Sequence, residues 1–258
     1  MSDLHFTIFK KRFLDLFLRS VKLDRTKVNN WNKYPFNIAS ISKFDEIEFP
    51  SKVTFLVGEN GSGKSTVIEA IAIALGFNSE GGTKNFNFTT CQTHSNLHEY
   101  LQLNFVLTKP NNGFFYRAES FYNVASNIDE LNKYGLKPLL SSYGGKSLHE
   151  QSHGESFLSL ILNRFSGNSL FILDEPEASL SPTRQMTFMA RMNNLIQEKS
   201  QFIIATHSPI LLSFPGASIY QINETGINSI KYEDTEAYQI TRAFLKSPER
   251  MFKELFKP

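Results

Sequence analysis

Residues Gly58 to Thr66 read GENGSGKST and match the pattern G-x-x-x-x-G-K-[ST]. They stand between an apolar run, 53–57, that favours a strand and an apolar stretch, 66–76, that favours a helix ended by Gly76. Glycines let the backbone curl so that consecutive N–H groups point at phosphate oxygens, and the helix N-terminus adds partial positive charge. The lysine of such a loop reaches the β- and γ-phosphates of a nucleotide, and the hydroxyl after it binds Mg²⁺. We therefore predict nucleotide contacts from Asn60, Gly61, Ser62, Gly63, Lys64, Ser65 and Thr66, with Lys64 also catalytic and Ser65 on the metal.

An acidic pair, Asp174 and Glu175, follows the apolar run LFIL at 170–173. An apolar strand that ends in carboxylates delivers them to the sheet edge where ligands of parallel sheets collect. Such a pair on its own is often an ordinary solvated strand end. Because it comes after a phosphate-binding loop, we predict instead that Asp174 holds Mg²⁺ and that Glu175 orients or deprotonates an attacking water.

A histidine, His207, follows another apolar run, FIIA at 202–205. A single histidine is usually structural or solvated. Here it lies 33 positions after Asp174 with one predicted helix between them, so the two strand ends can be neighbours. We predict that His207 is catalytic, with its ring hydrogen-bonded to the γ-phosphate and polarising the water.

The segment SHGES, 152–156, precedes the acidic pair by about 22 residues. Ser152 followed three residues later by Glu155 is a capping-box pattern, which predicts the start of a helix. A capped helix N-terminus is also an anion site, so a structural and a phosphate-binding interpretation are compatible.

In the order of these four motifs the sequence resembles the ATP-binding-cassette (ABC) ATPase superfamily through most of residues 50–210. The resemblance implies ATP and Mg²⁺ as cofactors and a head-to-tail homodimer with ATP at its interface. By this resemblance Ser152, Gly154 and Glu155 of one subunit would contact ATP held by the other, and residues 178–181 would form the loop that crosses the interface. More specifically, the chain resembles a compact stand-alone group of bacterial predicted ATPases, through VTFLVGENGSGKSTVIEAIA, RAESF, SYGGKSLHEQSHGESF and QFIIATHSPIL.

The sequence departs from the superfamily pattern at several positions. His153 replaces the second glycine of the usual LSGGQ signature, and Ser181 replaces the aspartate that usually ends the interface loop. A glutamine normally follows a strand before the signature. Glu119 is the best-placed substitute and our third candidate metal ligand, with Gln92 and Gln102 as alternatives. Tyr34 and Phe36 are the aromatic candidates for contact with adenine.

Strands that alternate with helices predict an α/β fold of the P-loop NTPase type, with a mainly parallel central sheet, an antiparallel β part and a short helical subdomain. We expect one domain, 1–258, whose helical subdomain spans about 119–168. The runs 101–107 and 114–118 flank the turn KPNNG and predict an antiparallel hairpin. Further helices are predicted at 155–164, 182–199 and 236–256.

Composition narrows the class of protein further. The 258 residues carry a net charge of +2, so no strong overall field draws the chain to nucleic acid. Cys91 is the single cysteine, which excludes an intramolecular disulfide and fits a cytoplasmic location. No apolar run approaches the roughly 20 residues that span a bilayer, so we expect a chain that is not membrane-embedded.

Three functions fit these observations. The first is a soluble ATPase whose dimer closure acts on a partner protein or nucleic acid, of the DNA-repair or defence type. The second is the ATP-binding subunit of an ABC transporter, although the 32 residues between Glu119 and Ser152 are short for the subdomain that grips a membrane partner. The third is a dimer that binds ATP and barely hydrolyses it, which Glu175 disfavours.

Overall fold

The central element of the computed structural model, which describes residues 16–84, 95–134 and 139–257, is a six-stranded sheet with strand order β5-β6-β7-β3-β8-β9. Neighbouring strands are parallel except β9, which pairs antiparallel with β8 at one edge. Every residue of β3, β6 and β7 is buried, as expected for parallel strands covered on both faces. The mainly parallel α/β sheet predicted from sequence is confirmed. Its strands are β3 (Val53–Val57), β5 (Asn112–Arg117), β6 (Ser169–Asp174), β7 (Gln201–Ala205), β8 (Ser218–Asn223) and β9 (Gly226–Ile230).

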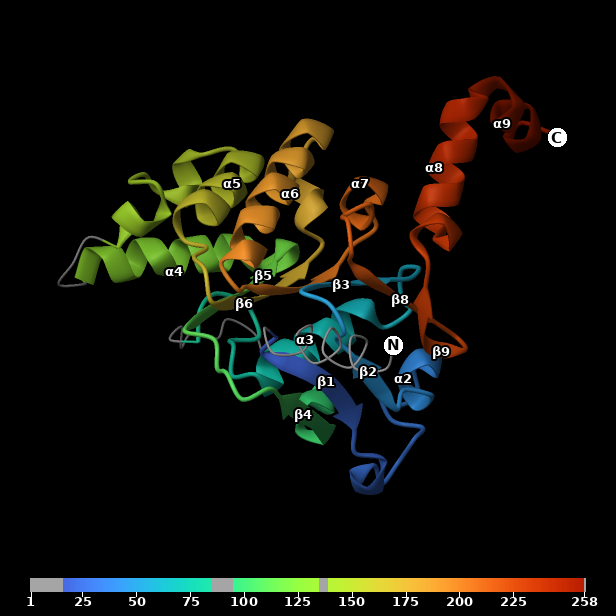
Figure 1. Ribbon diagram of the computed structural model, residues 1–258, viewed down its shortest axis with the longest axis horizontal. Coiled ribbons are helices and arrows are strands. Elements are labelled where there is room, and N and C mark those ends of the chain that lie inside the picture. The colour runs from blue at the N-terminus through green and yellow to red at the C-terminus, as the bar shows by residue number, and fades with distance from the viewer. Residues whose placement is uncertain (1–15, 85–94, 135–138, 258) are drawn as a thin grey trace, which may run out of the picture.

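Helices cover both faces of this sheet (Figure 1). One face carries α3 (Lys64–Ala74), which contacts β6 and β7. Alternate residues of β7 enter separate apolar cores: Phe202 and Ile204 face one, and Ile203 and Ala205 face the other. Each fully buried Leu, Ile or Phe stabilises the fold by roughly 1.5–3 kcal/mol. The other face carries α4 (Phe121–Tyr134), α5 (His153–Asn163), α6 (Pro182–Gln197) and α7 (Pro209–Leu212).

A second, three-stranded antiparallel sheet lies beyond α3, with strand order β2-β1-β4 (Figure 1). It places α3 between two sheets, and α3 contacts β4 as well as the central strands. Its strands are β1 (Leu18–Leu23), β2 (Glu46–Glu48) and β4 (Leu101–Phe105).

The predicted hairpin of 101–107 and 114–118 is wrong. β4 pairs antiparallel with β1, whereas β5 pairs parallel with β6 in the central sheet. The burial of the two strands gives the reason. Phe114, Phe115 and Tyr116 are all buried and need a strand covered on both faces, while Gln102 and Asn104 of β4 are exposed and suit a sheet with one open face.

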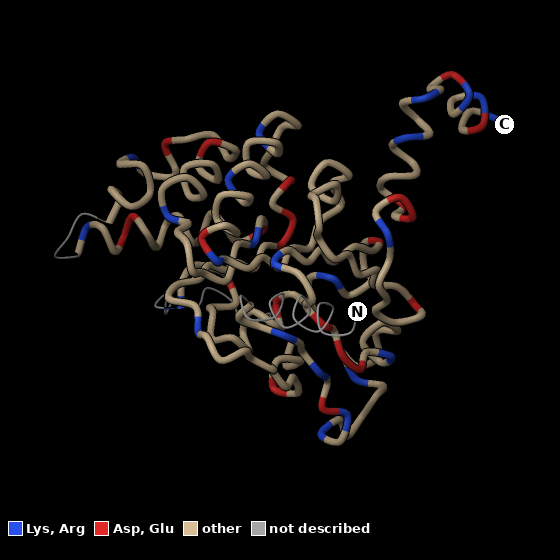
Figure 2. Tube along the Cα trace, viewed as in Figure 1, with Lys and Arg blue, Asp and Glu red and all other residues tan. Residues whose placement is uncertain are grey.

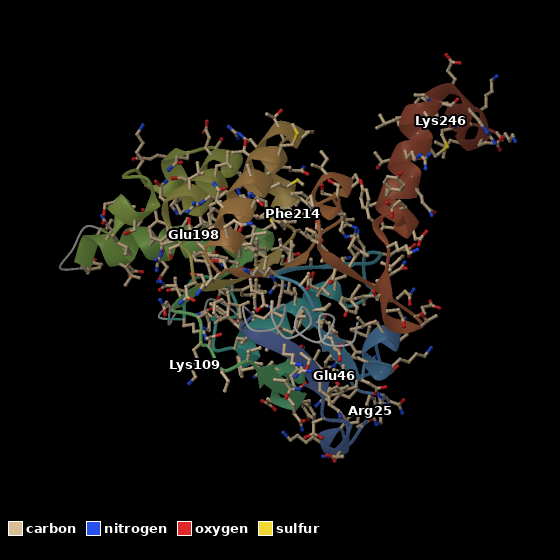
Figure 3. The ribbon with its side chains drawn as sticks, viewed as in Figure 1. Arg25, Glu46, Lys109, Glu198, Phe214 and Lys246 are labelled. Atoms are coloured by element: carbon tan, nitrogen blue, oxygen red, sulfur yellow. The ribbon has the colours of Figure 1, made fainter. Side chains whose placement is uncertain are left out.

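The predicted helical tail is confirmed as two helices, α8 (Glu236–Lys246) and α9 (Pro248–Leu255), divided at Ser247. Pro248 begins α9, where its missing N–H leaves no hydrogen bond unmade. The pair projects from the body, with Lys246 near its outer end (Figures 1 and 3). The shorter elements are α2 (Ala39–Ser42) and the 3₁₀ helices Arg25–Lys27, Asn96–Tyr100, Ala118–Ser120, Leu140–Tyr143, Leu148–Glu150, Pro176–Ser179 and Tyr232–Asp234.

Charged residues of both signs alternate along the chain near the first 3₁₀ helix (Figure 2). Arg25 lies 3.4 Å from Asp45, and Lys27 lies 3.7 Å from Asp24. Two of the basic residues in the described part of this region, Arg25 and Lys27, therefore have acidic neighbours. Cys91 and Gln92 lie outside the described residues, and so do the N-terminal basic residues Lys10, Lys11 and Arg12.

Candidate active site

The predicted phosphate-binding loop joins β3 to α3. Gly63 caps the helix with φ 97°, in the left-handed region that favours glycine, and Gly61 has φ 80°. A side chain at Gly58 would bring its Cβ within 2.3 Å of the carbonyl oxygen of Ile222, so the loop runs too close to β8 for any larger residue. Loop and helix thus have the strand–loop–helix setting that the sequence predicts.

Lys64 is the first residue of α3, and its side chain is folded over the loop. Its Nζ donates to the carbonyl oxygens of Gly58 at 2.7 Å and Glu59 at 3.0 Å. Burial lowers the pKa of Lys64, while Glu175, and after it Asp174, raise it. The ammonium group therefore lies at the mouth of the loop and faces the acidic pair.

Ser65 and Asp174 lie together where β6 ends beside α3. The Ser65 hydroxyl donates to Oδ1 of Asp174 at 3.5 Å. Burial raises the pKa of Asp174 to about 7, opposed by Arg117 and reinforced by Glu175. A hydroxyl and one buried carboxylate fit Mg²⁺, which keeps several waters and takes its remaining ligands from phosphates. The described residues hold no group of three or more His, Cys, Asp or Glu side chains able to bind a metal ion.

Asp174→Asn is expected to change how stability depends on pH. Because the folded-state pKa of about 7 lies above the ordinary value of 3.8, the unfolded chain releases this proton first as pH rises. Asp174 therefore destabilises the nucleotide-free fold progressively between about pH 4 and 7, by up to about 4 kcal/mol. Urea unfolding should show the variant close to wild type at pH 4.5 and clearly more stable at pH 8. An exposed control, Asp234→Asn, should show no such pH-dependent gain, and an equal difference at both pH values for Asp174→Asn would contradict the assignment.

Glu175 and His207 face each other across the ends of β6 and β7. His207 Nε2 lies 3.7 Å from Glu175 Oε1, and both side chains are about 40% exposed. Glu175 has φ 51° and ψ 53°, a left-handed backbone that costs a non-glycine residue on the order of 1–2 kcal/mol. Both residues line a cleft of about 560 Å³ together with Gly58, Glu59, Asn60 and Glu236. This cleft places an acid and an imidazole beside the phosphate-binding loop.

The segment 152–155 does not line the cleft that holds Glu175 and His207. The Ser152 N–H and hydroxyl donate to the Glu155 carboxylate at 3.0 and 2.7 Å, so the predicted capping of α5 is present. The Ser152 hydroxyl hydrogen bond lowers the pKa of the exposed Glu155. A Cβ at Gly154 would come within 2.4 Å of the Ser179 carbonyl oxygen, which shows how closely this turn packs on residues 176–181. Because α5 and α3 lie on opposite faces of the sheet, one copy does not bring this segment to its own phosphate-binding loop (Figure 1).

Glu119 projects into solvent just after β5, with an 83% exposed side chain. Its Oε2 lies 3.3 Å from Nη2 of Arg117, which also forms an ion pair with the buried Glu69 of α3. Arg117 stands opposite Asp174 in the parallel register of β5 and β6. Sequence reasoning missed Arg117 and Glu69, because they come together only when β5 joins the central sheet.

The two aromatic candidates for adenine have different surroundings. Phe36 is buried against Trp31 and Tyr100, so its ring is not free to stack on a base. Tyr34 is 55% exposed. A cavity of about 690 Å³ beside the loop has no aromatic side chain in its described lining, which comes from residues 38–40, 59–62, 221–225 and Glu236.

Ser181 forms a hydrogen bond within its own chain. It is the N-cap of α6, where its Oγ accepts the Arg184 N–H at 3.4 Å. Serine is a favoured N-cap residue, so the departure from aspartate keeps the helix start.

A phosphate-binding loop between a strand and a helix of a parallel sheet, with an acidic pair and a histidine on neighbouring strand ends, defines an ABC-type P-loop ATPase. Residues 28–208 match the model of an AAA domain family, and the chain belongs to that family. It is 30% identical over 151 residues to the DNA double-strand break repair Rad50 ATPase of Methanocaldococcus jannaschii, a match that covers 57% of this chain and 13% of that protein.

Solved structures with a similar course of the chain include an ATP-binding cassette of an ABC transporter in its ADP conformation and the SMC head domain from Thermotoga maritima. The first has a TM-score of 0.48 and 15% identity, and covers 93% of this chain and 99% of the other. The second has a TM-score of 0.43 and 17% identity, and the match covers 84% of this chain and 99% of the SMC head domain. Among the described residues, no helix combines the length and apolar character that crossing a bilayer requires.

Proposed function

We propose that this chain binds ATP with Mg²⁺, hydrolyses it and closes as an ATP-sandwiched homodimer that acts on a partner protein or nucleic acid in DNA repair or defence. The observation that carries the catalytic part is the meeting of three strand ends at one edge of the sheet. There Ser65 lies 3.5 Å from Asp174, and His207 lies 3.7 Å from Glu175, beside the ammonium group of Lys64. The single cysteine fits a cytoplasmic site of action.

In this proposal each residue of the site has a separate role in hydrolysis. The loop N–H groups and Lys64 bind the β- and γ-phosphates, and Ser65 with Asp174 holds Mg²⁺, which neutralises phosphate charge when bound. Glu119 is the third candidate ligand, and it would have to leave Arg117 to reach the metal. The oxygen of a water attacks the γ-phosphorus, the bond from that phosphorus to the β–γ bridging oxygen breaks, and ADP leaves. Glu175 takes the proton of the water, while His207 hydrogen-bonds the γ-phosphate.

The position of the segment 152–155 supports the proposed dimer. Ser152 and Glu155 are exposed at the start of α5 and do not line the cleft of their own copy. A second copy turned head to tail would bring this capped helix N-terminus, an anion-binding feature, over the γ-phosphate. In this proposal 119–168 is the helical subdomain that presents the segment, within the single domain 1–258.

The likeness to the Rad50 ATPase supports a nucleic-acid partner, although it covers only 13% of that protein. We therefore expect linear double-stranded DNA to raise steady-state ATP turnover several-fold. The stimulation should weaken as salt rises, because phosphate contacts release counterions. Phosphate release measured at 50 and 200 mM salt, with Glu175→Gln as the blank, tests this.

Unchanged turnover with DNA of any length would contradict a nucleic-acid partner and leave a protein partner. A dependence of turnover on membrane fractions, with co-purification of a membrane protein, would instead favour the transporter subunit.

A further inference from the structure

A carboxylate outside the four motifs touches the loop that carries the histidine. Glu177 lies in the 3₁₀ helix Pro176–Ser179, two residues after Glu175. Its Oε1 accepts the backbone N–H of His207 at 2.6 Å, across 30 positions of sequence. The contact ties the end of β7 to the segment that follows β6, and so fixes where the His207 backbone stands relative to Glu175.

The surroundings of Glu177 set it apart from an ordinary surface glutamate. Its Oε2 is buried, and the Thr206 hydroxyl lies beside the carboxylate. Burial raises the pKa of Glu177, and the His207 N–H opposes that rise. A buried carboxylate costs stability unless hydrogen bonds satisfy it, so the bond from the His207 N–H stabilises Glu177 in this place.

A second contact holds the next residue of the same loop. The Ser208 hydroxyl donates to Oε1 of Gln185 at 2.5 Å, and Gln185 Nε2 donates to the Leu180 carbonyl oxygen at 3.1 Å. Ser208 also caps α7, where its Oγ accepts the N–H groups of Ile210 and Leu211 at 3.2 Å. The loop is therefore fixed on both sides of the His207 side chain, by Glu177 before it and by Ser208 after it.

We infer that Glu177 is a positioning residue for hydrolysis, which holds the His207 backbone so that the imidazole meets Glu175 and the γ-phosphate. The inference rests on the proposed function, because it takes His207 to act in the reaction. Glu177 itself touches neither nucleotide nor water in this role. Its removal should therefore lower kcat and leave the affinity for ATP in place, since Lys64 and the loop bind the phosphates without it.

The test is a double-mutant cycle on steady-state ATP turnover with Glu177→Ala, His207→Ala and the double variant. Glu177→Ala should lower kcat about tenfold or more with KM changed less than threefold. In the His207→Ala background the same change should have almost no further effect, because the residue on which Glu177 acts is gone. Equal losses in both backgrounds, or a fall in ATP affinity that matches the fall in kcat, would overturn the inference.

A conservative variant, Glu177→Gln, distinguishes a positioning role of the Glu177 side chain from a role of its negative charge. Glu177→Gln keeps an oxygen that accepts the His207 N–H, so its kcat should stay within about threefold of wild type, and a loss as large as that of Glu177→Ala would overturn the positioning role. Glu46→Gln, in β2 of the three-stranded sheet and not among the residues that line the cleft, is the control and should leave kcat unchanged (Figure 3).

An NMR measurement that does not depend on ATP turnover tests the contact directly, and with Glu177→Gln it also serves if Glu177→Ala folds poorly. Protein labelled with ¹⁵N-histidine gives amide signals from at most six histidines, and His207→Ala identifies the one from His207. The short bond to a carboxylate should place that amide proton downfield, and Glu177→Gln should move it upfield by less than Glu177→Ala does. An unmoved signal in both variants would refute the contact. If His207→Ala alone left kcat unchanged, the proposed role of His207 would fail, whereas the amide shifts would still report on the Glu177 contact.

Discussion

Lys64→Ala is expected to weaken ATP binding by about 100-fold or more. The carbonyl oxygens of Gly58 and Glu59 hold the ammonium group at the mouth of the loop. In the proposed function this group supplies the charge that meets the β- and γ-phosphates. A charge-assisted hydrogen bond stabilises by roughly 1.5–3 kcal/mol, and the lysine can make more than one of them to phosphate oxygens. Calorimetric titration with ATP and Mg²⁺ measures the loss directly.

The loss should arise from the missing charge and not from unfolding. Burial already lowers the pKa of Lys64, which shows that the fold does not favour its charge, so the variant should unfold no more easily than wild type without nucleotide. Lys109→Ala, an exposed lysine at the far side of the central sheet from α8, should bind ATP as wild type does (Figure 3). An affinity of Lys64→Ala within threefold of wild type would contradict the phosphate-binding role of the loop.

Glu175→Gln is expected to lower ATP turnover by about 10²–10³-fold and to preserve ATP binding. A positioned general base contributes typically 10²–10⁴-fold, and the amide keeps the shape of the side chain while it loses the ability to take a proton. Burst and steady-state phosphate release, compared with nucleotide affinity, separate the chemical step from binding.

The matched control lies in the same cleft. Glu236, the first residue of α8, lines the cavity with Glu175 and His207, yet it follows no central strand. Glu236→Gln should change kcat by less than threefold. If Glu175→Gln hydrolysed ATP within tenfold of wild type, another group would have to be the base.

The parts of the site that sequence predicts well are those set by local pattern. The run VTFLV, the glycines and the hydroxyls after Lys64 favour a strand, a turn and a helix through local pattern alone. The structure differs in starting α3 at Lys64 instead of Thr66 and in ending it at Ala74, two residues before Gly76. The apolar runs that end in Asp174 and near His207 are buried strands, and they pair as neighbours. Their meeting follows from parallel strands whose carboxyl ends share one edge.

The parts that sequence does not predict depend on partners far apart in the chain. β4 pairs with β1, which lies about 80 residues earlier in the chain, and no turn motif between the two strands predicts that pairing. Glu177 reads as a solvated acid in a polar loop, and only the approach of β7 turns it into the acceptor for His207. Arg117 and Glu69 likewise become a pair only when β5 enters the central sheet, which the hairpin interpretation excluded.

The central claim is a dimer that closes around ATP, and sedimentation velocity on Glu175→Gln tests it most directly. Without nucleotide this variant should sediment as a monomer of 29.4 kDa. With excess ATP and Mg²⁺ it should shift to a dimer, because in the proposed dimer ATP that is not hydrolysed would keep Ser152 and Gly154 of each copy on the nucleotide of the other. Adding Lys64→Ala to the same variant should restore the monomer. A Glu175→Gln protein that stays monomeric while it is saturated with ATP would contradict the account.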